Sequence, residues 1–322
     1  FRLNPENYIF LNDKGRIHAD MRLFDDNGTG LQIYSVADST VVQDITLAIN
    51  RLNIGEFKRI IPYMPPVDGI INAEAHYIQQ DESSFMTAIE TGIDTLAYGG
   101  KPLGNWALSA VYLPSEDGAH NVDGYISRNG ITLAEINGRY TAAAKEGEHD
   151  LLNAHLALQR FPLELAGAFV SEDLASITGY AGADVSISGS TEAPVINGKF
   201  ITDSVNVFVP MTSMNLKFEN KAINVTDNKL IFDKYSIFSR GKNPYIIDGS
   251  VDFADMGNMY MDLKMTARNF EVFNAKKNKT SMVYGKMYID LNTSIKGTPD
   301  NISVKGNANI LGSSNFTYIL RE

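Results

Sequence analysis

The chain has 322 residues, of which 44% are hydrophobic, so it can bury a sizeable core. Lys and Arg number 28 against 38 Asp and Glu, and the scattered basic residues argue against binding to a nucleic-acid backbone. The absence of cysteine excludes disulfides, thiol catalysis and thiolate metal sites, but it leaves the cellular compartment open.

No segment of the sequence predicts a membrane span or a leader. No stretch approaches the roughly 18 to 20 apolar residues that a spanning helix needs, and residues 1–5 lack the apolar centre of a signal peptide. Residues 315–320 still alternate as a strand does. We therefore expect an internal segment of a longer protein, with any membrane anchor outside it.

Two short helices are predicted. In residues 56–64 the apolar side chains fall at i, i+3, i+4 and i+7, although Pro62 shortens or distorts the helix. In residues 161–170, Pro162 suits the first helical turn. A glycine and then strand-like residues follow each helix, and this order predicts a duplicated unit.

The domain organisation follows from this duplication. We expect a first β segment over residues 1–160, with the helix near 56–64, and a second over residues 161–322. The two segments are expected to be continuous.

From residue 205 onward the sequence is dominated by period two, which predicts strands with one apolar and one solvated face. On the strand near residues 259–266 we expect the apolar side chains to face one side and the polar ones to face solvent. The first group is Met261, Leu263 and Met265, and the second is Asp262, Lys264 and Thr266. Long helices between continuous apolar runs, typical of parallel sheets, are absent.

Turn-forming residues separate the predicted strands, at residues 203–204, 226–228, 241–244 and 256–258. A sheet of this length with one apolar face must curl, pair with another sheet or coil to hide that face. The pattern therefore predicts an elongated, all-β architecture.

A repeated glycine pattern adds a second self-similarity. Residues 186–189 (Ser-Ile-Ser-Gly) match residues 294–297 (Ser-Ile-Lys-Gly), and a further glycine follows nine residues later in each copy, at Gly198 and Gly306. Glycines at these positions would let the backbone turn or bulge where a side chain would clash.

The segment 185–200, VSISGSTEAPVINGKF, preceded by the Phe-Pro-Leu helix and a Gly-rich strand start, resembles the TamB C-terminal domain family. This family is related to AsmA-like and bridge-like lipid transport proteins, and the likeness is to its long Bacteroidetes-type members. The resemblance implies a periplasmic, inner-membrane-anchored protein built as a folded-over β-groove, or β-taco. It also implies a role in outer-membrane protein assembly or secretion with a barrel partner, in phospholipid movement between the membranes, or in both.

We therefore expect an all-β, folded-over, solenoid-like sheet whose apolar groove binds phospholipid acyl chains or unfolded outer-membrane β-strands. The expected lining residues are Val205, Val207, Val209, Leu216, Phe218, Val251, Phe253, Met259, Met261, Leu263, Met265, Met287, Ile289 and Leu291.

Two other functions stay open. A β-solenoid that binds or cleaves carbohydrate should present an exposed cluster of acidic or aromatic residues, and the single tryptophan, Trp106, offers little for sugar stacking. A purely structural envelope spacer should have a fully packed interior.

No catalytic, cofactor or metal site is predicted. The histidines share no metal-ligand spacing, and residues 116–117 and 146–150 lack the ligand period of a calcium loop. Residues 99–102 lack the ending of a phosphate loop. Paired carboxylates depend on tertiary geometry, and no pair stands out in the sequence. The five histidines are His18, His76, His120, His149 and His155.

Overall fold

The computed structural model describes residues 2–13, 15–37, 40–59, 61, 63–81, 84–115, 117–143, 145, 148–171, 173–277 and 282–319. Within these ranges the protein is all-β, as predicted, and two short 3₁₀ helices interrupt its antiparallel strands. No helix among these residues is long and apolar enough to cross a membrane.

The chain divides into two compact units, Phe1–Leu156 with Gly189–Glu192, and Ala157–Ser188 with Ala193–Glu322. The elements up to residue 141 all belong to the first unit. They are β1 (Arg2–Leu3), β2 (Tyr8–Leu11), β3 (Ile17–Phe24), β4 (Gly30–Ser35), β5 (Gln43–Asn53), η1 (Ile54–Arg59), β6 (Val67–Gln79), β7 (Phe85–Tyr98), β8 (Lys101–Pro114), β9 (Ala119–Arg128) and β10 (Ile131–Thr141).

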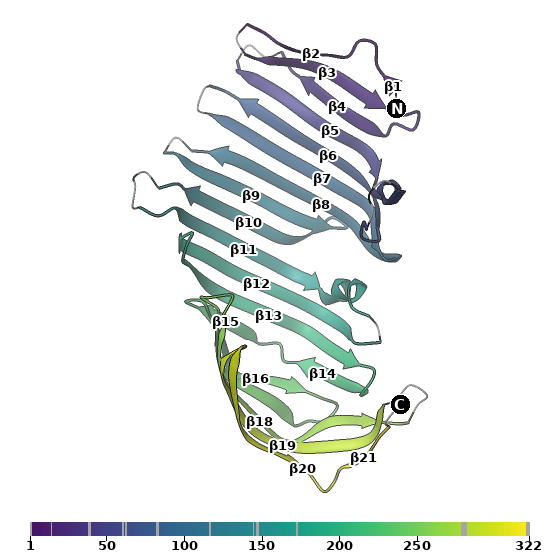
Figure 1. Ribbon diagram of the computed structural model, residues 1–322, viewed down its shortest axis with the longest axis vertical. Coiled ribbons are helices and arrows are strands. Elements are labelled where there is room, and N and C mark those ends of the chain that lie inside the picture. The colour runs from purple at the N-terminus through teal and green to yellow at the C-terminus, as the bar shows by residue number, and fades with distance from the viewer. Residues whose placement is uncertain are drawn as a thin grey trace. The chain divides into compact units, whose positions relative to one another are not determined.

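In the first unit, β3 to β10 pair in chain order, each antiparallel to the next. Figure 1 shows these strands side by side. The other edge of β3 pairs with both β1 and β2. All four residues of β2 are exposed. This topology is a meander, in which each strand needs only a short turn to reach its neighbour.

Strand β11 (Leu151–Pro162) contributes residues to both units. The elements that follow are η2 (Leu163–Ala168), β12 (Ser176–Ser190), β13 (Pro194–Val209), β14 (Met214–Phe218), β15 (Ala222–Thr226), β16 (Lys229–Phe238), β17 (Pro244–Asp252), β18 (Tyr260–Ala275), β19 (Val283–Thr298), β20 (Asn301–Ile310) and β21 (Asn315–Tyr318).

The sheet of the second unit contains an interrupted strand. β13 pairs with both β14 and β15, and these two short strands both pair with β16. From β16 the sheet continues through β17 and β18 to β19, which pairs with both β20 and β21. β14 also lies against β18, although β16 and β17 separate them in the sheet. The sheet of this unit therefore folds back on itself.

Two β-bulges bend the longest hairpin of the second unit. The register between β18 and β19 shifts between Ala267 and Phe270 and again between Glu271 and Phe273. An extra residue on one strand increases the local twist and bends that strand. Both strands are visibly curved in Figure 1.

Both predicted helices exist, as single 3₁₀ segments that begin close to the expected positions. η1 covers Ile54–Arg59, whereas the prediction extended to residue 64, and residues 60 and 62 lie outside the described ranges. η2 covers Leu163–Ala168, with Pro162 at its N-cap position.

Three of the four predicted turns connect strands, and one prediction is wrong. Residues 203–204 lie inside β13. Ser204 has a positive φ of 56°, and its N–H donates to Asn220 Oδ1 at 2.8 Å. These residues produce a local irregularity in a continuing strand, because polar residues that tolerate positive φ suit bulges as well as turns.

Glycines allow neighbouring strands to approach closely in the second unit. Gly249 and Gly297 both have a φ of 122°, and a Cβ on either would overlap a backbone carbonyl oxygen of the adjacent chain segment, that of Asp262 or Asn301. A Cβ on Gly306 would likewise overlap the backbone carbonyl oxygen of Asn292. The glycine pattern found in the sequence therefore reflects backbone contact.

We expect Gly249→Ala and Gly297→Ala each to lower the free energy of unfolding by about 2 kcal/mol or more, because the added methyl meets backbone and the φ is unfavourable. Gly312→Ala is the matched control, since a Cβ there meets nothing within 4 Å. Urea denaturation followed by circular dichroism measures the difference. Equal stability of all three variants would contradict the close approach.

Candidate functional site

The second unit has a continuous apolar face across β16 to β20. Directly opposed residues of antiparallel strands point to the same side of a sheet, so the register identifies the side chains that share a face. One row of opposed residues is Leu230, Val251, Met261, Gly297 and Ile302. The next row is Phe232, Gly249, Leu263, Ile295 and Val304.

The opposite face of the same strands is polar. Asp262 opposes Lys296, and the Lys296 ammonium donates to the Asp262 carboxylate at 2.8 Å. This hydrogen bond, together with the negative charge of Asp262, raises the pKa of Lys296. Lys264 opposes Ser294 in the next row. Asp262 and Lys264 are exposed, whereas Met261 and Leu263 are half-buried.

The register places most of the predicted lining residues on the apolar face. Val207 opposes Leu216, and Phe218 opposes Ile237, which lies in the same row as Tyr245 and Ala267. The other residues that the strands bring onto this face are Val205, Val209, Val251, Met261, Leu263, Met265, Met287, Ile289 and Leu291. Phe253 and Met259 lie outside the strands, in the connection between β17 and β18.

Part of this apolar face is packed shut. Phe270 and Phe273 are only 5% exposed, and Phe273 lies edge-on to Phe316 with ring centroids 5.8 Å apart. Tyr235 is also buried, and its hydroxyl donates to the carbonyl oxygen of Glu219 at 3.0 Å. Burial raises the pKa of Tyr235. Phe270 and Phe273 lie at the bulges of β18, whereas Tyr235 lies on β16 in the row of Ile247 and Met265.

Farther along the same strands the face is open. Met261, Leu263 and Met265 are half-buried, and Ile302 and Val304 of β20 are exposed. The apolar face of the second unit thus has a packed part and an accessible part. The accessible part is the candidate binding surface of this unit.

The first unit has an apolar face of its own that was not among the predicted sites. Leu31, Ile49, Ala73, Thr91, Leu108, Ile126 and Ala134 form one row across β4 to β10. Ile33, Leu47, Ala75, Ile89, Ala110, Gly124 and Ile136 form the next row. The alternation of Ile45, Leu47 and Ile49 with Thr46 and Ala48 was the available sequence signal.

These apolar side chains are accessible to solvent. Leu47 is 44% exposed, Ile89 and Leu108 are both 41% exposed, and Ile136 is 45% exposed. Contiguous exposed apolar surface of this kind is uncommon on isolated soluble proteins and marks sites of interaction with apolar partners.

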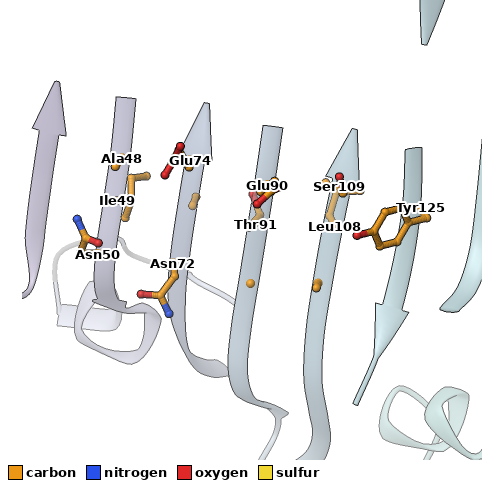
Figure 2. A pocket seen from close by; sticks show the side chains of 13 residues that line it. Ala48, Ile49, Asn50, Asn72, Glu74, Glu90, Thr91, Leu108, Ser109 and Tyr125 are labelled. Carbon is orange, nitrogen blue, oxygen red and sulfur yellow. The ribbon is translucent and has the colours of Figure 1, made fainter. Parts of the chain in front are cut away.

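A shallow hollow of about 340 Å³ lies over β5 to β9, and its lining includes residues of the opposite face together with members of the apolar row such as Ile49 and Leu108. Glu74 opposes Glu90, Glu90 opposes Ser109, and Ser109 opposes Tyr125, so the four side chains form a row. Figure 2 shows them standing on neighbouring strands. The structure therefore brings together a carboxylate pair that the sequence did not reveal. Both carboxylates are exposed.

Polar side chains contact the histidines that the sequence analysis considered as metal ligands. His76 Nε2 lies 2.8 Å from Asp44 Oδ1, and His120 Nδ1 lies 2.6 Å from the Tyr112 hydroxyl. Further partners are Asn12 for His18 at 3.1 Å and Glu192 for His149 at 3.2 Å, and His155 also has an interaction. In the described part of the chain, no three acidic or histidine side chains gather closely enough to hold a metal ion.

The acidic segments also have local partners. Asp117 pairs with Arg139. Asp150 accepts hydrogen bonds from the Ala143 N–H at 2.9 Å and the Tyr140 hydroxyl at 2.7 Å, and both lower its pKa, the backbone bond more strongly. Residues 116, 146 and 147 lie outside the described ranges.

Comparison with known proteins gives a match to one family model over part of the chain. Residues 233–320, which extend from β16 into the end of the chain, match the model of the TamB C-terminal domain. No curated protein and no solved structure matches the chain. The matched residues contain the apolar rows of β17 to β20.

We expect the packed and open parts of the second unit's apolar face to differ in their contribution to stability. Phe273→Ala should lower the free energy of unfolding by about 3–5 kcal/mol, because it leaves a cavity in a buried cluster. Met261→Ala should cost only about 1 kcal/mol, since part of its surface is already in water. Urea titrations of both variants make the comparison, and equal losses would contradict the division of this face.

Proposed function

We propose that the chain is a non-enzymatic module of the bacterial envelope whose apolar sheet faces carry phospholipid acyl chains. The observation that carries the proposal is the accessible apolar face, with the TamB match covering its strands in the second unit. A role of that domain in outer-membrane assembly or lipid transport supports it. We place the module in the periplasm, as part of an inner-membrane-anchored protein with an outer-membrane barrel partner.

The physical basis is the transfer of acyl chains from water to an apolar surface. Each buried methylene contributes about 0.8 kcal/mol, so a face that covers part of one chain retains it by several kcal/mol. Unfolded outer-membrane β-strands have alternating apolar residues and would use the same surface. An open face suits both partners better than a fixed spacer, whose apolar residues would all be packed.

The direct experiment is mass spectrometry of organic extracts from protein purified without detergent. Phospholipid recovered in amounts comparable to the protein supports carriage of lipid. A clean extract from folded protein, together with failure to bind added phospholipid, would sink the proposal.

The alternation of side chains between the two faces of β18 gives a sharper prediction. Photocrosslinkers at positions 261 and 263 in living cells should capture phospholipid, and those at 262 and 264 should not, because successive side chains point to opposite faces. Leu263→Asp should reduce capture at position 261, since an unpaired carboxylate on an apolar surface is costly to desolvate. Ser294→Asp is the control on the polar face, because the new carboxylate would stand opposite Lys264 and Lys305. Equal capture at both parities would contradict the assignment.

Carbohydrate binding is a second candidate, favoured by the hollow that holds Glu74, Glu90, Ser109 and Tyr125. Its carboxylates would accept hydrogen bonds from sugar hydroxyls, and the Tyr125 ring would provide a stacking surface. Opposed like charges such as Glu74 and Glu90 destabilise a sheet.

We expect Glu90→Gln to raise the free energy of unfolding by a few tenths of a kcal/mol through loss of that repulsion. If the hollow binds glycans, the same change should weaken binding on an oligosaccharide array about tenfold. Asp20→Asn, on the same face outside the hollow, is the control for glycan binding only, since its carboxylate pairs with Arg22. If the unmodified protein binds no oligosaccharide on the array, this second function is rejected.

A further inference from the structure

A hollow of about 590 Å³ lies on the polar face of the second unit, over β17 to β20. Four of its lining side chains form a block on β19 and β20. Asn292 opposes Asn307 in one row, and Asp290 opposes Asn309 in the other. Neighbouring strands lie about 4.8 Å apart, so the four polar groups are close neighbours. Strands are depleted in Asn and Asp, and strand propensity therefore does not account for this block.

A β-bulge shapes the hollow. The register of β18 against β19 shifts after Ala267, and Asn269 within this shift has a φ of 46°. Two lining side chains bond the backbone of Asn269. Its N–H donates to Asp290 Oδ1 at 2.7 Å, and its carbonyl oxygen accepts from Asn243 Nδ2 at 3.0 Å. Bulges redirect side chains beside functional sites, and this bulge accompanies the position of Arg268 in the lining.

Two cations stand along the β18 side of the hollow. Lys264 and Arg268 are both exposed, and Thr266 lies between them on the strand. Asp248 stands opposite Lys264, but its carboxylate accepts the Lys234 N–H at 3.2 Å. Within the part of the chain that the structure describes, neither cation of the hollow forms an ion pair. Both are therefore available to an anion from solution.

The charge and hydrogen-bonding groups of the lining select the ligand. The charged members are Lys264, Arg268 and Asp290, a net charge of +1 in a chain whose net charge is −10. The hollow of the first unit is the reverse, since its described lining has Glu74 and Glu90 and no Lys or Arg. An anion is attracted to the β18 side of the hollow in the second unit.

The β19 and β20 side offers hydrogen bonds in both directions. Each asparagine amide donates through its nitrogen and accepts through its oxygen, so one amide can bond two adjacent hydroxyls of a sugar ring. None of the described lining residues is aromatic, and a neutral sugar or a base would therefore find no ring on which to stack. The two sides together fit a ligand that has both a negative charge and several hydroxyls.

We propose that this hollow binds an acidic sugar, which is a sugar that carries a carboxylate or a phosphate. The anionic group contacts Lys264 and Arg268, and the ring hydroxyls pair with Asn292, Asn307 and Asn309. The site lies on the opposite face of β18 from the apolar rows, so the inference is independent of the proposed carriage of lipid. The same strands then serve two ligands, one on each face.

Isothermal titration calorimetry of the full chain at low salt tests the chemistry of the ligand. Tetragalacturonate or glucose 1-phosphate should bind about tenfold or more tightly than its uncharged counterpart, methyl-esterified tetragalacturonate or glucose. The acid that binds more tightly identifies the anionic group. Inorganic phosphate should bind about tenfold more weakly than that acid, because it lacks the ring hydroxyls. Failure of both acids to bind, equal binding of charged and uncharged forms, or equally tight binding of inorganic phosphate overturns the proposal.

Three variants locate the site. Arg268→Gln should weaken binding of the acidic sugar about tenfold, and Asn307→Ala about fivefold. Both side chains are exposed, so the fold should persist, and circular dichroism checks that it does. Lys286→Gln is the matched control, because it removes the same charge from the polar face of β19 outside the hollow, and it should cost less than about twofold. An equal loss in Lys286→Gln and Arg268→Gln would indicate general attraction and overturn the assignment to the hollow.

Discussion

Antiparallel pairing in register decides what each face of these sheets presents. Because opposed residues project to the same side, a period of two in each strand becomes a two-dimensional apolar surface only if neighbouring strands keep register. A slip by one residue would place Asp262 beside Ile295 and Leu263 beside Ser294. The Asp262–Lys296 ion pair on the polar side accompanies the correct register. Every functional statement about the apolar faces depends on this pairing.

The two units use their apolar residues differently. In the second unit, β14 approaches β18, and side chains such as Phe270 and Phe273 are removed from water. Bulges in β18 and glycines such as Gly249 allow the bending and the close strand contacts that this requires. In the first unit, Leu47, Ile89 and Ile136 stay accessible over several strands. The same alternation of apolar and polar residues therefore forms a stabilising core in one unit and an accessible apolar surface in the other.

Local sequence patterns could predict the strands, both short helices and most turns, because each depends on neighbouring residues. The parity of Met261, Leu263 and Met265 followed from alternation alone. The pattern could not separate the packed side chain of Phe273 from the half-buried one of Met261, since that depends on strands distant in sequence. The misassigned residues 203–204 show the same limit, because a polar pair that permits positive φ suits both a turn and a bulge.

Local sequence patterns also could not predict features that depend on which strands pair and in what register. Glu74 and Glu90 become neighbours only through the register of β6 and β7. An aromatic row likewise needs five strands in alignment, β6 to β10, and its rings are those of Tyr77, Phe85, Tyr112, His120 and Tyr140. Their spacing in the sequence carries no period that identifies them. The TamB resemblance supplied an expectation of a groove in both segments, but the hollow and the aromatic row came from the strand pairing of the first unit.

Strand β2 has a consequence for the colloidal behaviour of the isolated chain. Tyr8, Ile9, Phe10 and Leu11 are all exposed, and an apolar edge strand is a template for pairing between molecules. The net charge of −10 opposes such association through mutual repulsion. Added salt screens that repulsion, with a Debye length of about 10 Å at 0.1 M, and leaves the apolar edge unaffected. Solubility of the isolated chain should therefore decline as ionic strength rises.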